Sequence, residues 1–278
     1  MEMLPERFDE AAGETIAQAL GRRATTPRRH LEDNLRHVLA EPGSGVSAEL
    51  LEDFVDRGFR GYGHYWAEGA KLPALSRSIV SERFQVAEGL EHLMAAKARG
   101  HGLIIALPHI GSWEWGGAFL NTIGLTMTAV AEELDPPELF AWFKKKREAM
   151  GIYIEPLNEH AGTVLLSTLR AGGVVGLLCD RDIQGNGVEV EFFGERVSMP
   201  SGPATLALRT GATLVAAACY TGPGRDHYAA VTPPIDTSRT QRLREDVRRV
   251  TQDVTRELEH LIRRAPEQWH VLQPRFAS

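Results

Sequence analysis

Cysteines and long apolar runs are scarce in this sequence. The 278-residue chain has only two cysteines, Cys179 and Cys219, each inside a segment that is typical of a buried strand. We therefore expect two core residues in a reducing compartment and no disulfide framework. No apolar run approaches the roughly 18 to 20 residues that a membrane-spanning helix needs. The acidic N-terminal stretch has no apolar signal-peptide region, so we expect a protein that is soluble or lies on a membrane.

Several catalytic motifs are also missing, and each absence narrows the chemistry. There is no GxSxG, which argues against an ordinary nucleophile-elbow hydrolase. There is no GxxxxGK[ST] and no GxGxxG, so no motif indicates that the protein uses nucleoside triphosphates or dinucleotides. Without HExxH or a paired cysteine motif, the sequence offers fewer than the three protein ligands of a usual zinc site. We expect neither a metal nor a cofactor.

The charge of the chain argues against one class of partner and leaves another open. A net charge of -6, with 43% hydrophobic and 24% charged residues, is ordinary for a globular protein and gives no indication of nucleic-acid binding. Basic residues are nevertheless clustered, at Arg22, Arg23, Arg28, Arg29, Lys144–Arg147 and along 241–264. They are either solvated faces of amphipathic helices or contacts to an anionic bilayer or a phosphorylated co-substrate.

The first 85 residues favour helices and contain no good strand. Helical spacing covers Ala11–Leu20, His30–Leu39 and Ala48–Glu68, with a break at Glu41–Gly45. The third of these segments carries many aromatic residues, including Tyr65 and Trp66. We interpret them as core packing, with a lipid-contacting face as the alternative.

From about residue 86, short apolar runs alternate with helical segments. Strands are predicted at Leu103–Leu107, Thr126–Val130, Ile152–Ile154, Val174–Cys179, Val188–Phe193 and Thr213–Cys219. Helices are predicted at Leu90–Ala98, Trp113–Thr122, Pro137–Met150, Gly162–Ala171, Ala204–Arg209 and Gln241–Arg264. This alternation predicts an α/β fold, with a mostly parallel sheet covered by helices on both faces. Residues 86–278 would form the core and 1–85 a helical segment packed on it, effectively one domain.

The stretch Leu103–Gly117 is the best candidate for a catalytic site. An apolar strand ends at Pro108 and delivers His109 to the edge of the predicted sheet, where α/β proteins bind ligands. Because Glu114 lies five residues later, the two side chains can cooperate only if His109 sits in a loop and Glu114 in the first helical turn. Gly111 or Ser112 would then be the N-cap. A neutral imidazole there could act as a general base, and a carboxylate would fix its tautomer. The alternative is a helix-start acid and an ordinary loop histidine.

Several blocks together resemble one enzyme superfamily. The blocks are His109–Glu114, Leu177–Asp182, Val188–Gly194, Met199–Pro203, Ala207–Ala212 and Ala265–His270. The first is similar to the H-x4-D/E motif of the lysophospholipid and glycerolipid acyltransferases. Their order and spacing resemble the branch that includes the late acyltransferases of lipid A. Within that branch, the details resemble the phosphatidylinositol mannoside acyltransferases of actinobacteria.

The resemblance implies an activity and a site. It implies transfer of a fatty acyl group, typically palmitoyl, from acyl-CoA as co-substrate to the 6-hydroxyl of a mannose on a phosphatidylinositol mannoside. It also implies a peripheral enzyme at the cytoplasmic face of the cell membrane. We assign His109 as general base and Glu114 as the carboxylate that orients it. The substrate-binding or supporting candidates are Glu132, Arg147, Asp180, Arg181, Asp182 and Glu189. The motif ends in Glu, not the commoner Asp, which leaves open which acid contacts His109.

Three other functions remain open at this point. The acceptor could be lipid A, a lysophospholipid or another glycolipid, because periodicity does not assign the acceptor pocket. Water could replace the acceptor, which would make the protein an acyl-CoA thioesterase. The chain could also be a non-catalytic protein that binds membranes through its arginine-rich helix.

Overall fold

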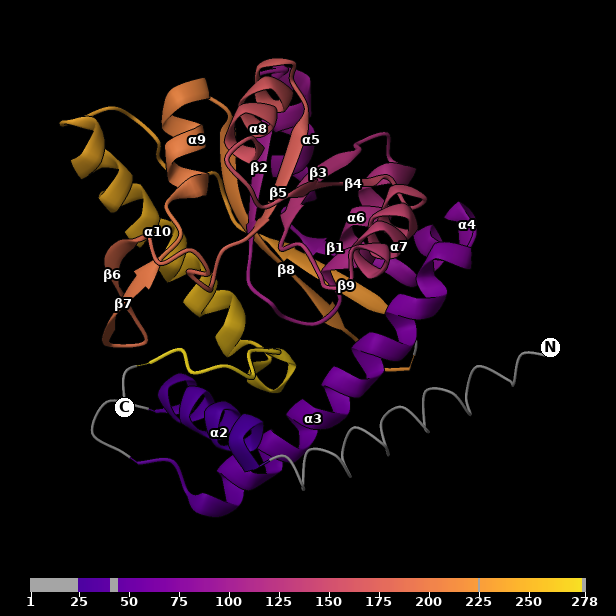
Figure 1. Cartoon of the computed structure of the whole chain (residues 1–278), viewed down its shortest axis with the longest axis vertical. Helices are drawn as coiled ribbons and strands as arrows, with labels where there is room; N and C mark the ends of the chain where they lie inside the picture. The colour runs from indigo at the N-terminus through magenta and orange to yellow at the C-terminus, as the bar shows by residue number, and fades with distance from the viewer. Residues whose placement is uncertain (1–24, 41–44, 225, 277–278) are drawn as a thin grey trace.

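The computed structural model describes residues 25–40, 45–224 and 226–276, which form a twisted sheet with helices on both faces and a helical layer along one edge (Figure 1). Its elements in chain order are α2 (Thr25–Leu39), α3 (Ala48–Lys71), η1 (Leu72–Ala74), α4 (Arg77–Arg83), β1 (Phe84–Glu88), α5 (Leu90–Arg99), β2 (Leu103–Leu107), α6 (Trp113–Thr122), β3 (Met127–Ala131), α7 (Pro137–Glu148), β4 (Ile152–Pro156), α8 (Ala161–Arg170), β5 (Val174–Leu178), β6 (Val188–Phe192), β7 (Glu195–Met199), α9 (Gly202–Thr210), β8 (Thr213–Thr221), β9 (His227–Val231), α10 (Leu243–Arg263) and η2 (Pro266–Gln268). The helix expected at Ala11–Leu20 lies outside the described residues.

Seven of the described strands form the central sheet, in the order β1-β9-β8-β2-β5-β3-β4. Only the β8–β9 pair is antiparallel, so the expected mostly parallel sheet is confirmed. The expectation that no strand precedes residue 86 is wrong, because β1 begins at Phe84. This strand has only one fully buried residue and depends on pairing with the distant β9, so it leaves little local signal. The strand predicted at Val188–Phe193 is real but lies outside the central sheet, since β6 pairs with β7 in a separate hairpin.

Alternate side chains of β2 serve two separate cores. Ile104 and Ala106 belong to an apolar cluster with α8, α9 and α10 on one face. Leu103, Ile105 and Leu107 belong to a second cluster with α5 and α6 on the other. All five residues of β2 are buried, as a central strand covered on both faces requires. The strand that leads to His109 is therefore held rigidly from both sides.

The arginine-rich helix α10 packs on the sheet and does not form a free basic surface. Its apolar stripe, including Val250, Val254 and Leu258, is buried in the first cluster. Several of its arginines pair with acidic neighbours: Arg249 with Asp246 and Asp253, Arg256 with Asp253, and Arg263 with Glu259. This observation favours the amphipathic interpretation of α10 and weakens the membrane-binding one.

Helix α3 runs along the carboxyl edge of the sheet beneath the other elements (Figure 1). Its first half packs against α2 in a third apolar cluster that includes Leu51, Val55 and Phe59. Its second half is anchored by buried Glu68, whose carboxylate accepts a hydrogen bond from His227 at 3.1 Å. Burial raises the pKa of Glu68, but hydrogen bonds from His227 and His64 outweigh it and lower the pKa to about 2. Core packing does not explain Trp66, which is 48% exposed.

Candidate active site

His109 lies in the loop between β2 and α6, as the spacing predicted. Ser112 is the N-cap of α6 and Glu114 lies in the first turn of that helix. Gly111 has φ +53°, and a Cβ at this position would lie 2.0 Å from the carbonyl oxygen of Cys219. Only glycine fits so close to β8 in this conformation, so the loop geometry depends on Gly111.

Two distant segments hold this loop by backbone hydrogen bonds. The N–H of Ser112 donates to the carbonyl of Cys219 at 3.1 Å, and the N–H of Gly111 donates to Gln268 at 2.9 Å. The carbonyl of His109 itself accepts a hydrogen bond from the N–H of His270 at 2.8 Å. The position of the imidazole is therefore fixed jointly by β8 and the C-terminal segment.

The carboxylate paired with His109 is Asp180, so the expectation that Glu114 orients the imidazole is wrong. His109 Nδ1 lies 2.5 Å from Asp180 Oδ1, and the backbone N–H of His109 donates to Oδ2 at 2.8 Å. The reason is topological: β2 and β5 are parallel neighbours with Leu107 opposite Leu178, so the residues just beyond their carboxyl ends meet. Asp180 was a candidate, but sequence spacing does not report strand order.

Asp180 is fully buried, and its environment favours the ionised form. Its Oδ2 accepts a further hydrogen bond from the indole N–H of Trp269 at 2.7 Å. Burial raises the pKa of Asp180, but the nearby His109 and the hydrogen bonds from His109 and Trp269 outweigh it, so the pKa is lowered. An ionised Asp180 accepts a hydrogen bond from Nδ1–H, which leaves Nε2 of the imidazole as the basic nitrogen. The His109 side chain is 26% exposed, so a substrate can reach it.

Glu114 belongs to a second polar cluster beside the first. Its Oε1 accepts hydrogen bonds from the Tyr65 hydroxyl and from the Arg147 guanidinium, both at 2.9 Å. Arg147 also lies over the rings of Trp113 and Phe143, at 5.2 and 5.4 Å from their centroids. Burial, followed by the charge of Glu114, raises the pKa of Tyr65 well above its ordinary value. The other carboxylate oxygen of Glu114 is buried and has no hydrogen-bond partner among the described residues.

The remaining candidates do not join these two clusters. Asp182 shapes the loop before β6, because it accepts hydrogen bonds from Gly185 N, Gly187 N and the Ser198 hydroxyl. Arg181 is half-buried beside it. Glu132 is exposed in the loop after β3, at the same edge of the sheet as His109. Glu189 is exposed on β6, 3.5 Å from Arg196, which agrees with the exposed alternative for this residue.

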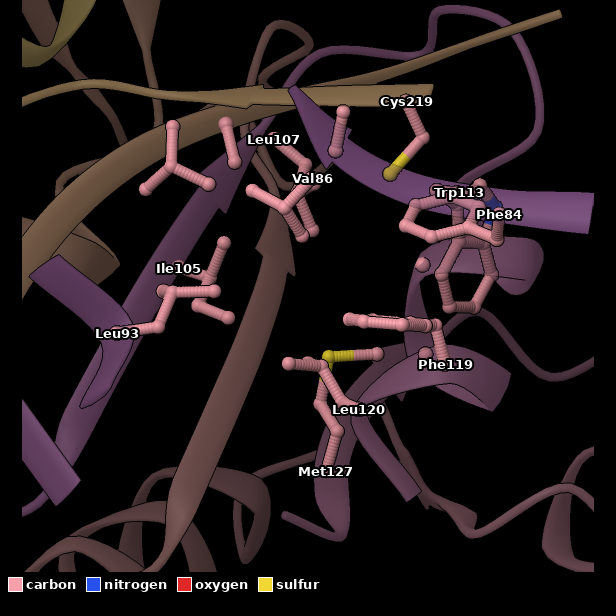
Figure 2. Close-up of a pocket in the computed structure, with 15 residues that line it drawn as sticks. Phe84, Val86, Leu93, Ile105, Leu107, Trp113, Phe119, Leu120, Met127 and Cys219 are labelled. Atoms are coloured by element: carbon pink, nitrogen blue, oxygen red, sulfur yellow. The ribbon is translucent and has the colours of Figure 1, made fainter. Parts of the chain in front are cut away.

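An apolar cavity lies between the sheet and α6 (Figure 2). The free space inside it is about 30 Å³. Its lining is almost entirely hydrocarbon and sulfur, formed by Phe84, Val86, Leu93, Ile105, Leu107, Trp113, Gly116, Gly117, Phe119, Leu120, Met127, Ala217, Cys219, Ala229 and Val231. Leu107 and Trp113, which flank the His109 loop in sequence, are both among these lining residues.

Cys219 and Gly116 show how closely α6 approaches the sheet at this cavity. A Cβ on Gly116 would lie 2.5 Å from the sulfur of Cys219, and one on Gly117 would lie 2.5 Å from Ile152 Cδ1. Both cysteines are buried free thiols, as expected for core residues. Burial raises the pKa of Cys219 to about 12, so this thiol stays protonated and behaves as an apolar side chain.

A polar hollow lies on the other side of the C-terminal segment. It has about 390 Å³ of free space and is lined by Arg57, Arg60, Gly61, His64, Thr221, Gly222, Gly224, Glu267, Gln268 and His270. Burial, together with the charges of His109 and His64, lowers the pKa of His270 to about 3, so this ring is neutral. His270 Nε2 is buried and has no hydrogen-bond partner within the described part of the chain.

Four residues of the site were not predicted as such: Tyr65, Trp269, His270 and Arg275. Arg275 donates from Nε to the backbone carbonyl of Asp180 at 2.7 Å and so fixes the strand end that carries the carboxylate. Trp269 and His270 fall in a block that supports the family resemblance, which is the only signal the sequence gives for them. Tyr65 is one aromatic among several on α3, and Arg275 lies in a stretch without a motif.

Across residues 25–40, 45–224 and 226–276, no three His, Cys, Asp or Glu side chains gather as a metal-binding group. None of the helices that the structure describes combines the length and the apolar character needed to cross a bilayer.

The whole sequence that carries this Asp–His pair and Glu–Arg cluster matches a known protein family. The family model of the bacterial lipid A biosynthesis acyltransferases matches residues 1–278. The chain belongs to this family and is an acyltransferase.

Individual relatives define the similarity further. A phosphatidylinositol mannoside acyltransferase of Mycobacterium tuberculosis (strain CDC 1551 / Oshkosh) is 36% identical over 279 residues, covering 99% of this chain and 84% of the relative. One of Mycolicibacterium smegmatis is 34% identical over 251 residues, covering 89% and 79%. A lipid A biosynthesis acyltransferase of Haemophilus influenzae is 22% identical over 253 residues, covering 90% and 76%. The chain is therefore a homologue of the phosphatidylinositol mannoside acyltransferases, as the resemblance implied.

Proposed function

We propose that this protein transfers a fatty acyl group from acyl-CoA to the 6-hydroxyl of a mannose on a phosphatidylinositol mannoside. The observation that carries the proposal is the hydrogen-bonded pair of the buried Asp180 carboxylate and the partly exposed His109 imidazole. The names of the relatives support the acceptor.

In the proposed mechanism, His109 Nε2 removes the proton of the acceptor hydroxyl as that oxygen attacks the thioester carbonyl. Asp180 holds the Nδ1–H tautomer and stabilises the imidazolium that forms. When the tetrahedral intermediate collapses, the carbon–sulfur bond breaks and the imidazolium returns its proton to the departing thiolate. The products are the acyl ester and free CoA, and no other reactant is required. Amide groups at the start of α6 and the Arg147 guanidinium are the donors for the developing oxyanion.

The apolar cavity supports a fatty chain as the transferred group. A saturated chain has no polar atoms after its carbonyl, and the cavity offers it an almost entirely apolar lining. Leu107 and Trp113, on either side of the His109 loop in sequence, line the cavity (Figure 2), so we place the carbonyl end of the chain at these two residues.

Filling the cavity should change the preferred chain length. Ala217 lines the cavity from β8, and Ala217→Leu would add three carbons to its middle. Since each buried methylene contributes about 0.8 kcal/mol, losing room for three should lower kcat/KM for palmitoyl-CoA by roughly 60-fold. Octanoyl-CoA should be turned over as by wild type, which is the control for folding. An unchanged ratio of palmitoyl to octanoyl turnover would place the chain elsewhere.

The polar hollow supports a phosphate-bearing substrate, since Arg57 and Arg60 line it beside the neutral His270. Both acyl-CoA and a phosphoinositol lipid carry phosphate, the group that a guanidinium binds best. Acceptors of this kind reside in bilayers, so we propose a peripheral enzyme on the cytoplasmic face of the cell membrane.

The decisive experiment is incubation of the purified chain with labelled palmitoyl-CoA and separate acceptors, with the products identified by mass spectrometry. We expect acylated phosphatidylinositol mannoside, with the new ester on a mannose 6-oxygen. Transfer to lipid A or a lysophospholipid, and not to phosphatidylinositol mannoside, would show that the proposed acceptor is wrong. CoA release that acceptor lipid does not change would make the enzyme a thioesterase.

Substituting Glu114 tests the role of the second cluster. Glu114→Gln keeps an acceptor for Tyr65 but leaves the half-buried Arg147 without its counter-ion. We expect kcat/KM to fall at least tenfold, and stability to fall by about 1–3 kcal/mol. Tyr65→Phe is the matched control, because it removes one hydrogen bond and no charge. A loss of stability with less than a tenfold loss of activity would make Glu114 purely structural.

A further inference from the structure

Helix α7 has an apolar side that faces away from the protein. None of its twelve residues, all described by the structure, is fully buried. Leu139 is 40% exposed and Trp142 is 48% exposed. They are three residues apart, so they lie on the same side of the helix. A surface helix normally turns such residues toward the core, so this arrangement is typical of a helix that contacts something else.

Helix α3 extends this apolar surface. Trp66 is 48% exposed and lies edge-on to Phe143 of α7, with 6.2 Å between the ring centroids. Lys146 lies over the Trp142 ring at 5.6 Å, and Lys145 is exposed beside it. We call the five residues Trp66, Leu139, Trp142, Lys145 and Lys146 the α3–α7 face.

The α3–α7 face adjoins the candidate active site. Tyr65 precedes Trp66 on α3, Arg147 follows Lys146 on α7, and both donate hydrogen bonds to Glu114. The same two helices therefore hold the site on one side and present exposed tryptophans on the other.

We propose that the α3–α7 face is the surface by which this protein docks on an anionic phospholipid bilayer. Tryptophan and leucine insert at the boundary between headgroups and acyl chains, and lysines reach the phosphates. This proposal rests on the proposed function. A lipid acceptor that enters the enzyme beside this face does not have to expose its acyl tails fully to water.

The charges on α7 favour a bilayer as the occupant. Of its four basic residues, Arg147 pairs with Glu114 and Lys144 with Glu148, so Lys145 and Lys146 supply the positive charge of the α3–α7 face. The preceding loop adds the acids Glu132, Glu133 and Asp135. Insertion of Trp66, Leu139 and Trp142 therefore contributes most of the binding, and the lysines add a preference for anionic lipid.

Flotation with vesicles tests the proposal. The anionic probe is a phosphatidylcholine vesicle in which about one lipid in three is phosphatidylglycerol. We expect wild type to bind these vesicles more tightly than vesicles of pure phosphatidylcholine. Trp66→Ala with Trp142→Ala should weaken binding to both kinds at least tenfold. Lys145→Glu with Lys146→Glu should weaken binding about tenfold to the anionic vesicles only. The matched control is Leu90→Ala with Met94→Ala, on α5, which removes two exposed apolar side chains at a distance from this face and should change nothing.

Tryptophan fluorescence gives an independent readout. The chain has five tryptophans, of which Trp113, Trp115 and Trp269 are buried. Brominated lipids should therefore quench wild type, and quenching should disappear in Trp66→Phe with Trp142→Phe. Unchanged vesicle binding by the alanine double variant would overturn the proposal. A concentration-dependent dimer that the same substitutions dissociate, without vesicle binding, would overturn it in favour of a second copy of the chain.

The docking proposal and the proposed function fail separately. His109→Ala should bind vesicles like wild type, and the tryptophan double variant should keep acyl transfer when the acceptor is supplied in detergent micelles. Vesicle binding without transfer to any acceptor would refute the function and leave the docking surface. Transfer in micelles with no vesicle binding by wild type would refute the docking surface and leave the proposed function.

Discussion

His109→Ala should lower the rate of acyl transfer by 10²- to 10⁴-fold (an order-of-magnitude range for loss of a general base) while leaving the fold in place. The imidazole is the only basic group positioned in the loop between β2 and α6, and its Nε2 is the nitrogen left free by the hydrogen bond to Asp180. Without it, the acceptor hydroxyl must lose its proton to water as it attacks. The measurement is kcat with palmitoyl-CoA and phosphatidylinositol mannoside at saturating concentrations.

A second variant separates the loss of the base from the loss of a buried contact. His109→Ala leaves the fully buried Asp180 with one donor fewer, which should lower stability by about 1–3 kcal/mol. His109→Asn can still donate a hydrogen bond to Asp180 but has no base, so it should be as inactive as the alanine variant and more stable. His160→Ala is the control, because that side chain is 77% exposed. Near-wild-type transfer by His109→Asn would refute the assignment of the base.

Local pattern was enough to predict the elements that carry the site. The strand Leu103–Leu107 and the helix Trp113–Thr122 have the predicted bounds. An unbroken apolar run and the residues typical of a helix start both lie within a few neighbouring positions, so local pattern can predict them. The same information placed His109 in the loop between them and Glu114 in the first helical turn.

Local sequence pattern could not predict which residues meet across the sheet. Sequence spacing joined His109 to Glu114, five residues away, whereas the sheet joins it to Asp180, 71 residues away. That contact depends on β2 and β5 being neighbours, and strand order is a property of the whole fold. Trp269 and Arg275 reach Asp180 from the C-terminal segment for the same reason.

Burial distinguishes residues that pattern treats alike. Trp66 and Phe59 both lie on the aromatic side of α3, yet Phe59 is 5% exposed and Trp66 is 48% exposed. The helix outruns its partner α2, so the apolar periodicity continues where the core ends. Similarly, the arginines of α10 and the lysines of α7 look equivalent in sequence, but several of the former pair with acidic neighbours while Lys145 is exposed.

Asp180→Asn should be nearly as damaging as the loss of His109, and for a specific reason. Oδ2 accepts the backbone N–H of His109 and the indole N–H of Trp269, so the asparagine oxygen should take that place. The amide NH₂ would then face Nδ1 and donate to it, which moves the imidazole proton to Nε2 and removes the base. In serine-protease triads the corresponding change lowers kcat about 10⁴-fold with the geometry intact. We expect a loss of on the order of 10³- to 10⁴-fold here.

The matched comparison is Asp182→Asn, two residues later, where the carboxylate only shapes the loop before β6 and activity should fall less than tenfold. Stability provides a second readout. The pKa of Asp180 is lowered in the folded protein, so its charge stabilises the fold above its ordinary pKa, and this contribution is lost as the pH falls through the lowered value. Asp180→Asn should therefore be less stable than wild type at pH 7, with a smaller difference in acid. In the proposed mechanism, Asp180→Asn changes the tautomer of His109 and Asp182→Asn does not. Equal activities of the two variants would therefore mean that Asp180 and His109 do not act together in acid–base catalysis.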